Sequence, residues 1–227
     1  MPVRRSVRAV VALAAAGVVG LGAAGCSASS VASSPASFST AAAGLTTVVE
    51  GPRIVVGDAA APHTATVFLD PRCSYCAKFE ESGGVALAEA AAAGKVRISY
   101  VVASFLDARS GGTASARSAN ALRASVEAGR FAEFQAAVLA SGGAEDPLRV
   151  ADGVEGLRGA EFDRAVREES YRDWVASAER VFEESGVGGT PTVLLDGREV
   201  GVGGALYDEA AFARVLRDAG VSGVPGV

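Results

Sequence analysis

The chain has 227 residues, 49% of them hydrophobic and 21% charged, a composition typical of globular rather than disordered proteins. Its formal charge is −5, from 21 basic and 26 acidic residues. Without Arg4, Arg5 and Arg8, which lie in a segment that we predict to be removed, 18 basic residues face 26 acidic ones, a charge of −8. Such acidity argues against nucleic acid as a partner, because binding to a phosphate backbone depends on Lys and Arg.

Residues 1–25 have the layout of a bacterial export signal. Three arginines and no acid precede the twelve-residue apolar run Val10 to Leu21, and small residues lead up to Cys26. The run is shorter than the ~20 residues that span a bilayer, which disfavours a transmembrane anchor. The small residues before Cys26 resemble a lipobox, although Ala23 stands where lipoboxes usually carry Leu. We therefore predict a lipidated Cys26 and a protein anchored by lipid at the outer face of the cytoplasmic membrane. Plain cleavage and secretion is the alternative.

Residues 26–44 are rich in Ser and Ala and hold almost nothing that could form a core. We interpret them as a flexible tether between the lipid and the folded domain. The folded domain is then expected to cover residues 45–227.

A strand followed by a cysteine-bearing helix start is the clearest local signal in the domain. Residues 64–70 form an apolar, β-rich run that predicts a buried strand. Pro71 ends this strand and helps to start a turn, and helix formers follow from Cys76 through Ala93, interrupted at Gly83-Gly84. Cys73 is therefore expected at or just before the first helical turn.

Cys73 and Cys76 are the two cysteines that remain in the domain if Cys26 carries lipid. A single pair of cysteines does not provide a framework of structural disulfides. A disulfide that closes so short a loop also stabilises the fold little. At a helix start, unpaired N–H groups and the helix dipole stabilise a thiolate, which predicts a lowered pKa for Cys73. Cys76, one turn further in, is predicted to be buried and to act as the resolving thiol.

Other uses of the cysteine pair require further ligands or partners. Structural zinc takes four Cys or His ligands, and the domain offers two cysteines and the single His63. Cu(I) accepts two thiolates, so copper handling stays open. A cysteine hydrolase needs a His base, whereas His63 stands at the entry to the strand, where we expect it to be exposed.

Residues 107–186 are mostly helical in pattern. Phe131, Phe134, Trp174 and Phe182 recur there at helical spacing. Such stripes predict core positions rather than ligand contacts.

A second signal lies far along the chain, at Thr190 and Pro191. Pro191 stands at the start of a β-prone run, where proline is tolerated. Asp196-Gly197 separates this run from the next and predicts a hairpin turn. On composition alone, Pro191 is equally well interpreted as a simple strand-start proline.

Together, the strand, the Cys73-Ser74-Tyr75-Cys76 helix start and the distant Thr190-Pro191 with its hairpin resemble the thioredoxin fold, specifically the exported DsbA-like thiol–disulfide oxidoreductases. The resemblance covers roughly residues 52–219. It implies an α/β thioredoxin fold, with a central mixed sheet flanked by helices and a helical insertion at about 107–186.

The resemblance also implies a function and a set of partners. Thr190 and Pro191 would be joined by a cis bond, rare enough to be a deliberate feature, and would hold an incoming peptide and keep metal off the thiols. The protein would exchange disulfides with exported proteins, without a bound cofactor, and a membrane partner of the DsbB or vitamin K epoxide reductase type would reoxidise it. A reductase serving one client and a Cu(I)-binding chaperone are the alternatives.

Two positions depart from the pattern of strongly oxidising members. Ser74-Tyr75 stands where they carry Pro-His, and Val67 stands where some members carry a buried acid. The thiolate is therefore expected to be less perturbed than in those members. Asp70 is the nearest acid, and its effect on Cys76 is left open.

Overall fold

The computed structural model describes residues 37–224. The predicted signal peptide, Cys26 and the first part of the predicted tether lie outside the described residues. Six strands form one mixed sheet in the order β1-β2-β4-β3-β5-β6. The strands are β1 (Thr47–Glu50), β2 (Arg53–Val56), β3 (His63–Leu69), β4 (Val96–Val102), β5 (Thr192–Leu195) and β6 (Arg198–Val200). Only β3 and β4 pair in parallel, with Val67 opposite Tyr100.

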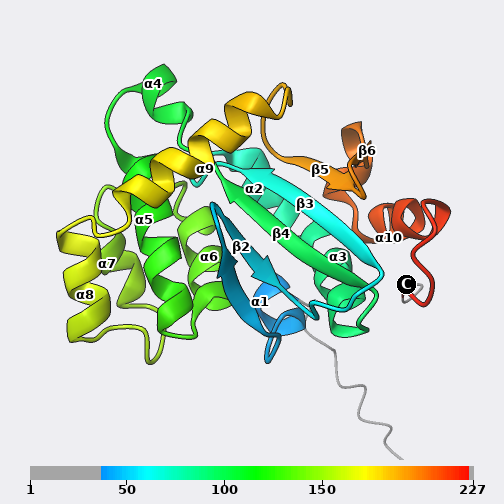
Figure 1. Ribbon diagram of the computed structural model, residues 1–227, viewed down its shortest axis with the longest axis horizontal. Coiled ribbons are helices and arrows are strands. Elements are labelled where there is room, and N and C mark those ends of the chain that lie inside the picture. Colours follow the sequence, from blue (N-terminus) through cyan, green and yellow to red (C-terminus); the bar gives the residue numbers. More distant parts are fainter. Residues whose placement is uncertain (1–36, 225–227) are drawn as a thin grey trace, which may run out of the picture. The chain divides into compact units, whose positions relative to one another are not determined.

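Helices lie on both faces of this sheet (Figure 1). They are α1 (Phe38–Ala41), α2 (Ser74–Glu80), α3 (Gly83–Ala92), α4 (Leu106–Ser110), α5 (Ala114–Glu127), α6 (Phe131–Ala140), α7 (Pro147–Ala151), α8 (Ala160–Arg167), α9 (Arg172–Glu184), the 3₁₀ helix η1 (Gly203–Tyr207) and α10 (Glu209–Asp218). Figure 1 shows α9 crossing the near face of β3 and β4, with α2 and α3 behind the sheet. The helices α4 to α9 form the predicted insertion, so this part of the architecture is confirmed.

The central strand β3 is apolar on both sides because both of its faces are covered. Val67 and Leu69 belong to the larger core, which also contains residues of α1, α2, α3, α6 and α10. Phe68 faces the other way and packs in a smaller cluster with Phe182 of α9. Successive side chains of a strand point to opposite faces, which explains why the run reads as continuously hydrophobic.

The glycine pair does not itself break the helix that follows the cysteines. The helix α2 ends at Glu80, and Gly83 and Gly84 are the first residues of α3. A Cβ at Gly83 would lie 2.7 Å from the carbonyl oxygen of Leu206. The glycine is therefore required by the close approach of η1, and the helix is interrupted at Glu81 and Ser82, directly before the glycines rather than at them.

The predicted tether is too long, because its last residues belong to the folded domain. Phe38 of α1 is 1% exposed, and its ring meets that of Tyr100 edge-on at a centroid distance of 6.0 Å. Ala42 is buried as well. The Ser- and Ala-rich composition concealed a single aromatic anchor, so the folded part begins before residue 45.

The aromatic residues predicted for the core of the insertion are buried, with one exception. Phe131, Phe134 and Phe182 are buried. Trp174 is only half-buried, and its indole Nε1 donates a hydrogen bond to the carbonyl oxygen of Gly51 at 2.8 Å. Trp174 therefore joins α9 to the turn between β1 and β2.

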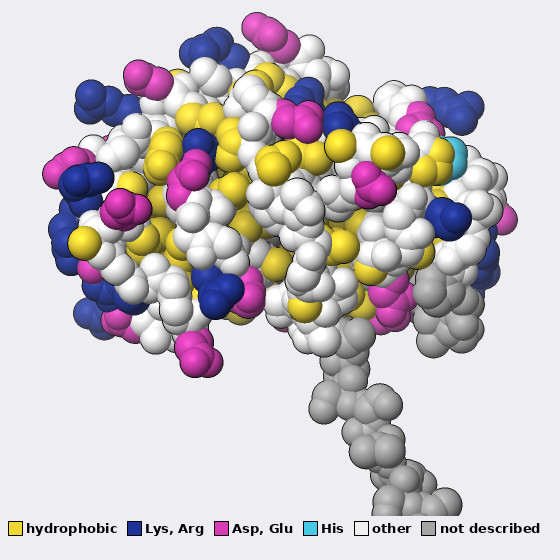
Figure 2. Space-filling view, turned by 60° about the horizontal axis from the view of Figure 1, so that its bottom comes forward, with side chains coloured by type: hydrophobic (Ala, Val, Ile, Leu, Met, Phe, Trp, Pro, Cys, Tyr) yellow, Lys and Arg dark blue, Asp and Glu magenta, His cyan; other side chains and the backbone are white. Residues whose placement is uncertain are grey.

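The surface carries charges of both signs. Figure 2 shows basic and acidic side chains interspersed over one face of the described part, with apolar atoms between them. Among residues 37–224, no helix has the length and apolarity required to cross a bilayer.

Candidate redox site

Cys73 lies at the N-terminus of α2, at the end of a tight turn that follows β3. Its backbone N–H donates to the carbonyl oxygen of Asp70 at 2.9 Å, with Pro71 in the second position of the turn, where its fixed φ is favourable. Cys73 is the N-cap residue, with an extended backbone, and α2 begins at Ser74. The predicted placement of Cys73 at the helix start is confirmed.

The Cys73 thiol is set up to ionise. A hydrogen bond from Cys76 is the largest of the effects that lower its pKa to about 6, helped by Thr190 and by the backbone N–H groups of Cys76 and Tyr75. Partial burial opposes the shift. These hydrogen-bond donors stabilise the Cys73 thiolate, as a His between the cysteines would. The pKa of Cys73 is thus lowered even though Ser74 and Tyr75, the two residues between the cysteines, are uncharged.

Cys76 has the opposite character. It is 1% exposed, and burial raises the pKa of its thiol well above the ordinary value, with the hydrogen bond to Cys73 and the charge of Cys73 adding to the shift. A backbone N–H of Asp70 acts in the other direction. Asp70 therefore affects Cys76 through its main chain.

Thr190 and Pro191 lie beside the cysteines, as the resemblance implied. The Thr190–Pro191 bond is cis, and the Cys73 thiol donates to the Thr190 carbonyl oxygen at 3.2 Å. The buried Thr190 hydroxyl has no hydrogen-bond partner among the described residues. A free hydroxyl can rotate to donate to the Cys73 thiolate, which agrees with its lowering of the pKa of Cys73. The hairpin that follows is also confirmed, with positive φ at Asp196 and Gly197.

An aromatic pair flanks the cysteines on the side of η1. Tyr75 is 54% exposed, its ring lies 5.6 Å from that of Tyr207, and the Lys78 ammonium is 4.8 Å from the Tyr75 ring centroid. Burial raises the pKa of Tyr207, and the charges of Cys73 and Cys76 raise it further. Tyr207 is not predicted from the sequence, because only tertiary packing of η1 brings it to the site.

A buried carboxyl lies on the same helix as the cysteines. Glu80 Oε1 accepts hydrogen bonds from Gln135 and, at 3.4 Å, from the Tyr100 hydroxyl. Burial raises the pKa of Glu80 to about 8, so its neutral form predominates at pH 7. The spacing of four residues from Cys76 places Glu80 on the buried side of α2, a signal that the sequence analysis did not use.

The side chains that commonly bind metal ions do not form a larger cluster with the cysteines in the described part of the chain. Within residues 37–224, no group of three or more His, Cys, Asp or Glu side chains is placed to hold one. His63 lies at the opposite end of β3 from the cysteines and is half-buried rather than exposed, because its Nδ1 pairs with Asp196 at 2.8 Å. It is not placed to act as a base for Cys73.

A strand, a helix start with a Cys-x-x-Cys pair and an opposing cis-proline loop define a thioredoxin-type redox site. The family model described as thioredoxin matches residues 50–225. The chain therefore belongs to the thioredoxin family. No curated protein matches it.

Solved structures with the same fold include several disulfide-exchange proteins. The MdbA protein of Corynebacterium diphtheriae, a thiol-disulfide oxidoreductase, is 19% identical with a TM-score of 0.62, and the match covers 75% of this chain and 93% of that chain. The MdbA protein of Actinomyces oris is 18% identical with a TM-score of 0.62, covering 79% and 89%. Reduced DsbA of Mycobacterium tuberculosis is 20% identical with a TM-score of 0.57, covering 79% and 95%. These matches confirm the expected DsbA-like fold.

Proposed function

We propose that this protein is an exported thiol–disulfide oxidoreductase that acts on secreted proteins through Cys73 and Cys76. The observation that carries the proposal is the asymmetry of the pair. Cys73 is partly exposed and has a pKa lowered to about 6, whereas Cys76 is buried and has a raised pKa. One thiol is suited to attack or be attacked, and the other to resolve.

In the oxidising direction, a client thiolate attacks the Cys73 sulfur of the Cys73–Cys76 disulfide, and Cys76 leaves as a thiolate that takes up a proton. A second client thiolate then attacks the mixed disulfide at the client sulfur, and Cys73 leaves as a thiolate. The client has lost two electrons and the protein has gained them. Thr190 and Pro191 would hold the client peptide next to Cys73.

The stability of the Cys73 thiolate supports one direction of electron flow over the other. Hydrogen bonds that stabilise the reduced form make the disulfide a better oxidant. We therefore favour disulfide donation over the alternative of a reductase that serves one client. A membrane-bound, quinone-linked partner of the DsbB or vitamin K epoxide reductase type would accept the two electrons.

Trapping tests the proposal directly. In a Cys76→Ser variant, Cys73 should accumulate mixed disulfides with exported proteins, which non-reducing gels and mass spectrometry of the trapped partners would identify. Cys73→Ser is the matched control and should trap nothing. If the Cys76→Ser variant also traps nothing but the wild type binds Cu(I), the protein is a copper chaperone instead.

We further propose that export ends in lipidation of Cys26, which would hold the protein at the outer face of the cytoplasmic membrane. The sequence before Cys26 is the support for this step. Mass spectrometry of the membrane fraction distinguishes the outcomes, since a lipidated N-terminal Cys26 carries acyl chains. An unmodified, secreted chain would show plain cleavage.

A further inference from the structure

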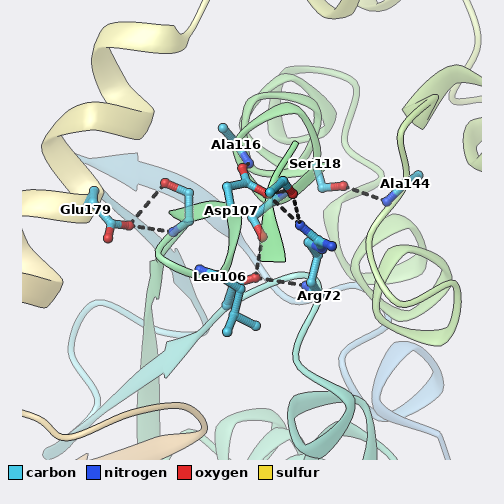
Figure 3. Close-up of polar contacts among 11 residues, drawn as sticks. Arg72, Leu106, Asp107, Ala116, Ser118, Ala144 and Glu179 are labelled. Atoms are coloured by element: carbon cyan, nitrogen blue, oxygen red, sulfur yellow. Dashed lines mark hydrogen bonds and ion pairs between the residues drawn. The ribbon is translucent and has the colours of Figure 1, made fainter. Parts of the chain in front are cut away.

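The turn that carries Cys73 is bound to the helical insertion by side chains on both sides of it. Figure 3 shows these contacts, in which Arg72, the residue before Cys73, reaches Asp107 of α4. The Arg72 Nη1 donates to Asp107 Oδ1 at 3.2 Å and to the carbonyl oxygen of Gly111 at 2.8 Å. Both side chains of this ion pair are largely buried, at 23% and 14% exposure.

Asp107 is the centre of the contact, because it also holds the start of α5. Its two carboxylate oxygens accept the backbone N–H groups of Ser115 and Ala116, each at 2.9 Å. These are N–H groups that a helix leaves unpaired in its first turn. One carboxylate thus joins the insertion helix α5 to the residue next to Cys73.

Asp70, at the other end of the turn, is held by the same part of the insertion. Its Oδ2 accepts the Leu106 N–H at 3.0 Å, and its Oδ1 accepts the Ser115 hydroxyl at 2.7 Å and the Arg72 N–H at 2.9 Å. Asp70 is fully buried. Ser115 therefore donates hydrogen bonds to both acids, from its hydroxyl to Asp70 and from its backbone N–H to Asp107.

Close packing leaves Arg72 little room to move. A Cβ on Gly143, in the loop after α6, would lie 2.6 Å from the Arg72 Cγ. The aliphatic part of Arg72 is therefore confined between this loop and α4. A turn fixed by ion pair, hydrogen bonds and packing sets the position of the residue that follows it.

We propose that Asp107 is a positioning residue for the redox site, through which the helical insertion holds the Asp70–Cys73 turn and thereby the Cys73 sulfur among its hydrogen-bond donors. The inference rests on the proposed function and adds a role for the insertion within it. Asp107 does not touch the sulfur. It acts through Arg72 and Ser115.

The direction in which the pKa of Cys73 shifts in an Asp107 variant distinguishes a positioning role from a purely electrostatic one. An Asp107→Asn variant removes a negative charge near the site, which on Coulombic grounds alone should favour the Cys73 thiolate and lower the pKa of Cys73. Loss of positioning works in the opposite direction, because the sulfur moves away from donors to which it was fitted. We expect the pKa of Cys73 to rise by about one unit, which reduces the thiolate fraction at pH 6 about fivefold.

The experiment follows thiolate absorbance at 240 nm against pH in the reduced full-length protein. Cys76 is kept in both proteins, because its raised pKa keeps it protonated in the pH range where Cys73 ionises. An Asp163→Asn variant is the matched control. It breaks the contacts of Asp163 with Arg158 and Arg167 in the same insertion, and it should change stability without moving the pKa of Cys73. A lowered or unchanged pKa in Asp107→Asn overturns the proposal.

A second variant covers the case in which Asp107→Asn does not fold. Ser115→Ala removes the hydroxyl bond to Asp70 and leaves both Asp107 contacts with α5 in place. The pKa of Cys73 should again rise, and an unchanged value would contradict the proposal. The titration needs no client, so it is independent of the trapping experiment. Failure to trap would refute the proposed function. An unchanged pKa of Cys73 in the variants would refute only the role of Asp107.

Discussion

Cys73 and Cys76 are one helical turn apart and yet have opposite ionisation behaviour. The difference comes from position. Cys73 lies at the helix N-terminus, where Cys76, Thr190 and backbone N–H groups lower the pKa of its thiol, while Cys76 is enclosed by the core. The sequence spacing predicts which cysteine is which. It does not reveal that neutral hydrogen-bond donors, rather than a charged neighbour, stabilise the thiolate.

The Thr190 hydroxyl should contribute measurably to this stabilisation. Thr190→Val keeps the shape of the side chain but removes a donor, so we expect the pKa of Cys73 to rise and the disulfide to become a weaker oxidant. Titration at 240 nm and equilibration with glutathione would measure both. Thr190→Ser, which keeps the hydroxyl, is the control, and equal effects of Val and Ser would show that the hydroxyl plays no part.

At the scale of elements, α2 is attached to its surroundings by a neutral carboxylic acid. Glu80 of α2 meets Gln135 of α6 and Tyr100 of β4 in the core. Because the pKa of Glu80 is about 8 in the folded state and near 4.3 when unfolded, the folded chain binds this proton more tightly. Its contribution to stability is therefore present at low pH and is lost as pH rises from about 4 through 8.

A Glu80→Gln variant should remove this pH dependence. Urea unfolding at pH 5, 6.5 and 8 is expected to show the wild type losing stability with rising pH and the variant losing much less, with the variant the more stable at pH 8. Asp70, whose pKa burial raises to about 6, adds a smaller loss of the same sign below pH 7. Glu81→Gln, at the exposed neighbour, is the control and should follow the wild type.

The short helix α1 should be essential to the stability of the fold. Phe38 is 1% exposed and packs on Tyr100, so Phe38→Ala should lower the free energy of unfolding by roughly 3–5 kcal/mol, as for other buried aromatic residues. Val48→Ala on β1, where the side chain is 42% exposed, should cost far less. A small effect of Phe38→Ala in urea unfolding would place residues 37–44 back in the tether.

At the scale of the whole molecule, the sequence supports the fold class better than it supports the boundaries and the network around the site. Periodicity and turn chemistry identify β3, the helix start and the Asp196-Gly197 hairpin, because these depend on local interactions. The start of the domain was misplaced, since one Phe among Ser and Ala gives no periodic signal. Tyr207, Glu80 and Asp107 act through contacts between distant segments, which composition and spacing do not encode.

The reduction potential of the full-length protein follows from the same chemistry. A Cys73 pKa of about 6 lies between the ~7 of thioredoxin and the ~3.5 of DsbA. We therefore expect a potential between about −270 and about −120 mV. Equilibration with glutathione would measure it, and a value at or below that of thioredoxin would favour the reductase alternative.

The bond between Trp174 and Gly51 has a practical consequence for spectroscopy. Trp174 is the only tryptophan in the chain, and it joins α9 to the β1–β2 turn at the outer edge of the sheet, whereas the cysteines follow the central strand β3. Its fluorescence should therefore report whether the helical layer stays docked on the sheet and should be nearly silent to the oxidation state of Cys73 and Cys76. Tryptophan emission would then report the docking of the helices and thiol titration the redox state, as two independent measurements on one sample.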